Sequence, residues 1–249
     1  MYNLEFITQQ DFENHVANTI RSYNNTLNSI GLNGFNSNII DPIKLLFDKN
    51  VFGKSFNEII ELEIYRQRDK SNTNAIGYFH QNIFKYIANC EVPKNGWDVI
   101  VRLPNSNLIY VEIKNKHNTM NSSSAQKTYI QMQNQIMKMP NAQCFLVEAI
   151  APASRNIEWG CSVENQHVSD PRIRRVSMDV FYHIVVGREN SFFDMCMQLP
   201  STIEKVISNN DSIAVEPDTV LEGLKSKHPD MLTALYLLAF KRYEGFDQL

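Results

Sequence analysis

A predicted β-hairpin near the middle of the chain places the strongest constraint on its fold. Two apolar runs rich in β-branched residues, at 97–103 and 108–114, are separated by the turn sequence PNSN. Such runs, bounded by Pro and Asn, are typical of two strands joined by a tight turn. Side chains alternate across a strand, so Glu112 and Lys114 point to one face, and Asp98 can lie beside them on the partner strand.

These three charged side chains indicate metal-assisted hydrolysis of a phosphodiester. Asp98 and Glu112 offer oxygen ligands to Mg²⁺, which takes few protein ligands and keeps several waters. The metal would polarise the phosphate and lower the pKa of a bound water. Lys114 would orient or deprotonate that water, or neutralise charge in the transition state. The alternative is a partly buried ion pair with no catalytic role, because the pattern is short.

The polar segment after Lys114 strengthens the nuclease interpretation. No acidic residue occurs between Ile113 and Val147, although the whole chain has 24 Lys and Arg against 27 Asp and Glu. Basic, amide and hydroxyl side chains are the ones that contact phosphates and base edges. An ordinary polar surface loop is the alternative. We expect DNA contacts from Asn115, Lys116, His117, Asn118, Asn121, Ser122 and Lys127.

A second basic segment follows Asp170 and Pro171. It contains Arg172, Arg174 and Arg175, whose planar forks suit guanine edges and phosphates. We expect these arginines to contact DNA, and the alternative is a solvated basic strand.

Hydrophobic periodicity predicts the remaining elements. A strand at 143–150 is strongly apolar and expected to be central, and a further strand is expected at 156–163. The order helix, strand, strand, helix, strand predicts an α/β fold with a central mixed sheet flanked by helices. Helices are expected at about 9–30, 41–48, 55–68, 71–87, 122–139, 177–186, 191–208 and 218–243.

Composition bounds the class of protein. A chain of 249 residues with 43% hydrophobic content can bury a sizeable core. No apolar run is long enough to span a bilayer, and the N-terminal sequence lacks the pattern of a signal peptide, so we expect a cytosolic protein. The four cysteines form no CxxC pair, so free thiols are expected.

The spacing of Asp98 and the Glu112-Ile113-Lys114 triplet resembles the PD-(D/E)XK nuclease motif, with Trp97 where many members have Pro. Four blocks together resemble the type II restriction endonucleases that recognise the interrupted palindrome GGNCC. They are residues 69–87, 96–130, 144–150 and 172–182, and the stretch EIKNKHNTMNSSS is the most specific part.

The resemblance covers roughly residues 55–205. It implies an enzyme that cleaves double-stranded DNA with Mg²⁺ and belongs to a restriction–modification system in the bacterial cytoplasm. It implies a homodimer matching the palindrome, and a cognate DNA methyltransferase that acts on the same site without stable binding. In it Asp98 and Glu112 bind metal and Lys114 completes the catalytic trio. Such enzymes often carry an extra acid on a neighbouring helix, so Glu63 is a further candidate metal ligand. The alternative is that Glu63 belongs to a solvated face of its helix.

The resemblance also implies one endonuclease domain over residues 1–249, with extra N- and C-terminal helices. Its catalytic core is expected at about 55–150, and its DNA-contacting and C-terminal helical part at about 151–249. Three other functions stay open. A repair or recombination nuclease would share the trio but cut by structure, and a non-catalytic DNA-binding protein would not need it. A multimeric structural protein would use the C-terminal helices.

Overall fold

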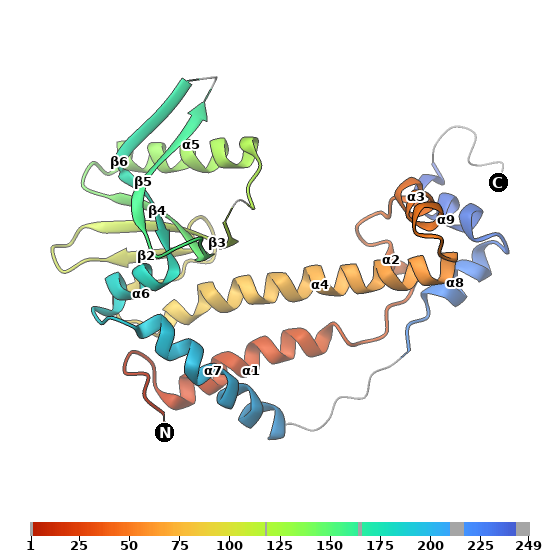
Figure 1. Ribbon diagram of the computed structural model, residues 1–249, viewed down its shortest axis with the longest axis horizontal. Helices are drawn as coiled ribbons and strands as arrows, with labels where there is room; N and C mark the ends of the chain where they lie inside the picture. The colour runs from red at the N-terminus through yellow and green to blue at the C-terminus, as the bar shows by residue number, and fades with distance from the viewer. Residues whose placement is uncertain (1, 118, 164–165, 210–216, 243–249) are drawn as a thin grey trace. The chain divides into compact units, whose positions relative to one another are not determined.

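The computed structural model in Figure 1 describes residues 2–117, 119–163, 166–209 and 217–242. Contacts divide the chain into two compact units. Unit 1 comprises Met1–Ile20 and Ala75–Asp211, and unit 2 comprises Arg21–Asn74 and Ser212–Leu249. Whether both act as one endonuclease domain stays a prediction.

The elements follow one another in α/β order. No helix in the described ranges is both long and apolar enough to cross a bilayer. The helices are α1 (Gln9–Asn25), α2 (Leu32–Phe35), α3 (Pro42–Phe52), α4 (Phe56–Asn82), the 3-10 helix η1 (Ile83–Tyr86), α5 (Ser122–Lys138), α6 (Met178–Val186), α7 (Ser191–Ser208), α8 (Val220–Lys227) and α9 (Met231–Phe240). The strands are β1 (Cys90–Glu91), β2 (Val99–Arg102), β3 (Leu108–Lys116), β4 (Gln143–Ile150), β5 (Asn156–Val163) and β6 (Gln166–Ser177).

Unit 1 is built on a six-stranded mixed sheet in the order β1-β2-β3-β4-β6-β5. The predicted hairpin is the antiparallel β2–β3 pair, while β3–β4 and β4–β6 are parallel. Strand β4 lies inside the sheet, and all but one of its six central residues are apolar. The predicted α/β class, the hairpin and the central strand are therefore confirmed.

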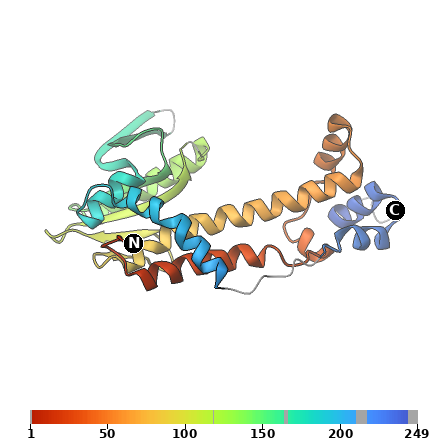
Figure 2. The same ribbon diagram turned by 60° about the horizontal axis from the view of Figure 1, so that its bottom comes forward.

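Alternating side chains give the sheet two apolar faces. Tyr110 and Leu146 pack with residues of α5, including Tyr129. Val111 and Val147 point the other way and pack with α1, α6, α7 and the end of α4. Figures 1 and 2 show α5 and the α6–α7 pair on opposite sides of the sheet. The central strands β3 and β4 thus pack against apolar side chains on both faces, as their near-continuous apolar sequences require.

Unit 2 is helical and has its own core. Phe35, Ile60, Leu224 and Leu235 are fully buried and bring together α2, the first part of α4, α8 and α9. The Arg68 guanidinium also binds the Asp218 carboxylate, with Nη2 2.8 Å from Oδ1. These contacts join segments from both ends of the chain into one body.

Three predicted boundaries are wrong. The helices expected at 55–68 and 71–87 are one helix, α4, because the Ser71 hydroxyl donates to the Gln67 carbonyl at 3.2 Å within the helix and does not cap a new one. The helix expected at 218–243 is split, since the Asp230 side chain caps α9 by accepting from Thr233 N at 2.8 Å. The first helix ends at Asn25, short of the expected residue 30.

Candidate active site

The hairpin brings Asp98, Glu112 and Lys114 together. The Lys114 Nζ donates to Glu112 Oε1 at 2.7 Å. Val99 pairs with Val111, and Asp98 N donates to the Val111 carbonyl at 3.0 Å, so Asp98 comes beside Glu112 on the next strand. By strand alternation all three side chains share the sheet face that α5 covers.

The Asp98 carboxylate lies in a half-buried, electrostatically strained position. Burial raises the pKa of Asp98. The 2.7 Å hydrogen bond from Ile113 N to Asp98 Oδ2 lowers this pKa, as does the positive charge of Lys114, whereas the negative charge of Glu112 raises it further. The net result is a raised pKa. Two carboxylates held this close repel each other, and a divalent cation would relieve that repulsion.

Helix α4 supports the hairpin from the other side of the sheet. The Gln81 Nε2 donates to the Asp98 carbonyl at 3.2 Å. One helical turn earlier, a Cβ on Gly77 would lie 3.3 Å from Asn115 Oδ1. Sequence reasoning named no role for Gln81, although its spacing of four from Gly77 puts both on one helical face. Asn115, a predicted DNA contact, therefore approaches α4 and points away from Lys114.

The other predicted DNA contacts after β3 surround the start of α5. Lys116 is exposed, and Thr119 Oγ1 donates to its carbonyl at 3.0 Å. Asn121 caps α5 by accepting from Ser124 N at 2.8 Å. Ser122 and Lys127 are exposed on α5, whereas Asn118 lies outside the described residues.

The three predicted arginines do not form one patch. Arg172 and Arg174 lie on one face of β6 and Arg175 on the other, by strand alternation. Arg172 forms a fork to Asp170, and Arg174 Nε donates to Asn156 Oδ1 at 2.8 Å. Arg175 binds Glu148, with Nε 2.7 Å from Oε1.

Glu63 lies in unit 2, on the first part of α4, and only 7% of it is exposed. Its carboxylate accepts from Arg66 Nε at 2.6 Å and from Gln67 Nε2 at 3.1 Å. Burial raises the pKa of Glu63, but these hydrogen bonds outweigh that effect and lower it. Its part in a metal site stays a prediction.

Comparison with known proteins decides the family. The sequence model of the Eco47II restriction endonuclease family matches residues 4–208, which include the whole sheet and Asp98, Glu112 and Lys114. The chain belongs to the Eco47II restriction endonuclease family.

Two members of this kind are similar over most of their length. The type II restriction enzyme Sau96I of Staphylococcus aureus is 31% identical over 209 residues, covering 81% of this chain and 80% of that protein. The type II restriction enzyme Eco47II of Escherichia coli is 26% identical over 220 residues, covering 82% and 88%. Type II restriction enzymes are site-specific deoxyribonucleases, so the predicted enzyme class is confirmed at the level of the family.

The donor set of this Eco47II-family chain suits magnesium. In the part of the chain that the structure describes, no group of three or more His, Cys, Asp or Glu residues is arranged to hold a metal. Asp98 and Glu112 provide two carboxylates, and Mg²⁺ is usually held by one or two carboxylates with waters completing its shell. Zinc, in contrast, is usually held by three or four protein ligands, most of them Cys or His.

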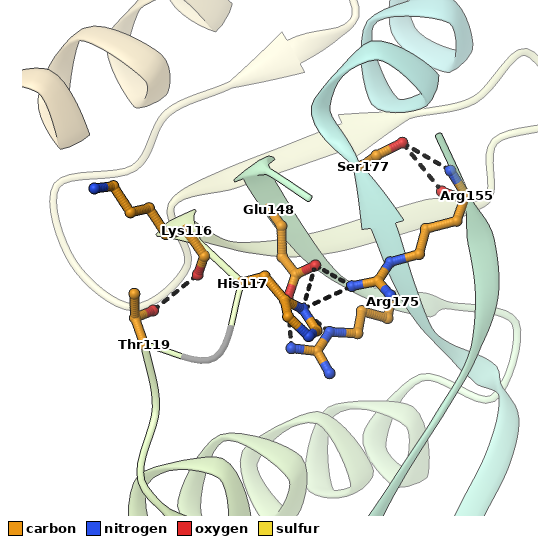
Figure 3. Close-up of polar contacts among 7 residues, drawn as sticks. All are labelled: Lys116, His117, Thr119, Glu148, Arg155, Arg175 and Ser177. Atoms are coloured by element: carbon orange, nitrogen blue, oxygen red, sulfur yellow. Dashed lines mark hydrogen bonds and ion pairs between the residues drawn. The ribbon is translucent and has the colours of Figure 1, made fainter. Parts of the chain in front are cut away.

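Sequence reasoning missed a buried ion cluster next to the trio, which Figure 3 shows. Glu148 on β4 is 1% exposed and pairs with Arg155, Arg175 and His117. The His117 Nδ1 lies 3.0 Å from Glu148 Oε1 and 2.9 Å from Arg155 Nη2. Burial raises the pKa of Glu148, but these hydrogen bonds outweigh burial and hold it below its usual value.

One signal in the sequence pointed to this cluster. Glu148 is the only charged residue of the apolar strand 143–150. A lone carboxylate inside a buried strand needs a partner. Nothing local in the sequence shows that Arg155 and Arg175 are those partners, because they belong to other strands or loops.

Proposed function

We propose that the chain is a type II restriction endonuclease that hydrolyses phosphodiester bonds of double-stranded DNA with Mg²⁺ as cofactor. The observation that carries the proposal is the Lys114–Glu112 pair with Asp98 beside it, in a chain of the Eco47II restriction endonuclease family. Metal-assisted hydrolysis needs two carboxylates and an ammonium on one sheet face. An ion pair without a catalytic role would need only Glu112 and Lys114, and not Asp98.

Asp98 and Glu112 would hold the metal. A bound Mg²⁺ polarises the phosphate and makes a bound water more acidic. The raised pKa of Asp98 supports this role, because a carboxylate that is strained without a cation gains from binding one. Glu63 remains a candidate for a third carboxylate from unit 2.

Lys114 would act on the attacking water and the reacting phosphate. In the structure its ammonium is held 2.7 Å from Glu112 Oε1, so its position is fixed before substrate binds. From there it can orient the water, accept its proton when neutral, or stabilise negative charge on the phosphate in the transition state. The half-buried setting of the pair strengthens each of these electrostatic effects.

DNA binding is assigned to the polar segment after β3, the start of α5 and the arginines of β6. Lys116, Lys127 and Ser122 are exposed and suit phosphate contacts. Asn115, His117, Asn118, Asn121, Arg172, Arg174 and Arg175 complete the proposed set.

The proposed site is GGNCC, and the proposed active form is a homodimer whose two-fold axis matches the palindrome. The resemblance of the blocks at 69–87, 96–130, 144–150 and 172–182 to enzymes of that specificity supports this assignment. A methyltransferase acting on the same site would protect the host DNA in the cytoplasm.

The test is digestion of phage DNA by the purified protein with Mg²⁺ or with EDTA, followed by sequencing of the fragment ends. The expected result is discrete fragments ending within GGNCC, formed only with Mg²⁺. Ends at another motif would keep the chemistry and refute the specificity, and smearing would favour a structure-directed nuclease. Intact DNA that is still shifted on a gel would indicate a non-catalytic binding protein.

Two variants separate catalysis from binding. Glu112→Gln and Lys114→Met are expected to bind the duplex and to lose cleavage. Glu204→Gln is the matched control, because Glu204 is exposed on α7. Full activity of Glu112→Gln would refute the proposed role of the trio.

A further inference from the structure

The ion cluster around Glu148 carries more positive than negative charge. Its single carboxylate faces two guanidinium groups, those of Arg155 and Arg175, whose side chains are each only 18% exposed. Among the described residues Glu148 is the only carboxylate that pairs with either arginine. The buried Nε of Arg155 has no hydrogen-bond partner there. Buried cations that exceed their counterions are costly unless a further anion binds beside them.

This surplus charge lies at the catalytic strand. Glu148 is the register neighbour of Lys114 on the parallel β3–β4 pair. A small cavity of 100 Å³ opens there, with the bases Lys114, Lys116 and Arg175 and the acid Glu148 in its wall. Trp159 and Ala125 close it on the apolar side. The lining is therefore net positive, and the occupant should be an anion.

The cavity is small enough to suit a single phosphate group. Its volume of about 100 Å³ is well below the roughly 300–1,000 Å³ of pockets that hold whole small-molecule ligands. Arg175 presents a fixed donor to it. Both Nε and Nη2 of Arg175 bind Glu148 Oε1, at 2.7 Å and 2.5 Å, while Nη1 has no partner among the described residues.

The loop that carries Lys116 is tied to the same cluster. His117 N donates to the Ile150 carbonyl at 2.9 Å, and the His117 ring contacts Glu148 (Figure 3). Arg155 is held through its backbone, because its N–H donates to Ser177 Oγ at 2.9 Å and its carbonyl accepts from Ser177 N at 3.0 Å. Glu148 thus links three separate segments around the cavity.

We propose that this cavity binds one backbone phosphate of the DNA strand, adjacent to the phosphate that is cut. Lys116 and Arg175 contact the phosphate, and Glu148 is a positioning residue that fixes Arg175 and the loop of His117. The proposal deepens the nuclease function and rests on it. It adds a role for Glu148, and it makes Arg175 a phosphate contact and not a reader of bases.

The test uses the full chain and a duplex containing GGACC, titrated by fluorescence anisotropy in EDTA so that no cleavage occurs. A series of duplexes carries one neutral methylphosphonate each, at successive positions of the strand. For the wild type, one position near the cut is expected to weaken binding about tenfold or more, as the loss of a charge-assisted hydrogen bond does. In Arg175→Met, the methylphosphonate at that position is expected to weaken binding much less than in the wild type, because only the Lys116 contact is left to lose.

Salt dependence gives a second readout that a merely structural role would not change. Arg175→Met is expected to reduce the slope of log K against log salt by about 0.9, the value for one lost phosphate contact. Arg175→Lys keeps the charge and loses the fork, so it is expected to keep the slope and lose part of the methylphosphonate penalty. Arg188→Met is the control, because Arg188 pairs with Glu5 and Asp194 away from the cavity.

Glu148→Gln tests the positioning role. In this variant Arg155 and Arg175 stay charged but lose the carboxylate that fixes their positions. The slope of log K against log salt is therefore expected to be unchanged, while the methylphosphonate penalty and kcat fall. If the methylphosphonate penalty is the same in wild type, Arg175→Met and Glu148→Gln, and the wild type cuts DNA, the phosphate site is refuted while the nuclease function stands. If no methylphosphonate position weakens binding, but inorganic phosphate stabilises the protein against unfolding, the cavity binds free anions, and the assignment to a DNA backbone phosphate is refuted. A wild type that neither binds nor cuts the duplex would overturn both functions.

Discussion

Replacing Glu148 by alanine tests how the ion cluster contributes to stability. The carboxylate is 1% exposed and accepts one hydrogen bond from each of Arg155 and Arg175, and it forms a further ion-pair contact with Arg175 Nη2. Removing one partner of a buried ion pair costs about 3–5 kcal/mol, because the remaining charge is left without compensation. We expect a loss of about 3 kcal/mol, at the lower end of that range, because each arginine side chain keeps 18% of its surface exposed to water.

The companion variant replaces the whole cluster with apolar side chains. Glu148→Leu combined with Arg155→Met and Arg175→Met leaves no buried charge. Buried ion clusters replaced in this way are often neutral or stabilising. We therefore expect the triple variant to regain most of the stability lost in Glu148→Ala and still to bind DNA poorly.

Urea unfolding followed by tryptophan fluorescence measures both effects. The chain contains two tryptophans, Trp97 and Trp159, and both belong to unit 1, so the signal reports on the unit that carries the cluster. Glu13→Gln is a suitable control, since it breaks the more exposed pair with Lys205 and should cost about 1 kcal/mol or less. A loss below about 1 kcal/mol in Glu148→Ala, or a triple variant as unstable as the single one, would refute the reasoning.

Three further results are expected. Without metal at pH 7, Asp98→Asn should unfold at a higher urea concentration than the wild type, and it should lose cleavage. The pKa of Asp98 is raised in the folded protein, so its charged carboxylate lowers the stability of the wild type above that pKa. The advantage of Asp98→Asn should vanish below the unfolded pKa of 3.8, where folded and unfolded wild type both bind the proton. Tyr182→Phe should stabilise the protein by about 1 kcal/mol in the same urea assay, since the fully buried hydroxyl has no partner among the described residues. The lowered pKa of Glu148 means that its charge contributes stability above the unfolded pKa of 4.5, and that this contribution is lost as the pH falls through the lower folded value. Wild type and Glu148→Ala should therefore converge in acid urea titrations.

Each of these has a result that would contradict it. Equal urea midpoints of Asp98→Asn and wild type at pH 7 would show that the carboxylate is not strained. Destabilisation of Tyr182→Phe would reveal a water or other partner for the hydroxyl. A gap between wild type and Glu148→Ala that stays constant below pH 4.5 would mean that Glu148 is not the titrating group.

The sequence by itself determined the hairpin, the face shared by Glu112 and Lys114, and the α/β class. These depend on local patterns: alternation within a strand, a turn of Pro and Asn, and apolar runs whose length fits buried strands. Segment 143–150 was recognised as the central strand for the same reason. Helix boundaries were less secure, because cap residues such as Ser71 can sit inside a helix when its neighbours pack well enough.

Only the tertiary structure decided what lies around the trio. Gln81 is 17 residues from Asp98 in the sequence, and Glu148 is 34 residues from Lys114, and no local pattern links either pair. Strand order placed Glu148 beside Lys114, and the pairing of β4 with β6 delivered Arg175 to its carboxylate. A sequence records which residues carry charge. Which of those charges share a buried site depends on long-range strand pairing, and that is settled when the sheet assembles.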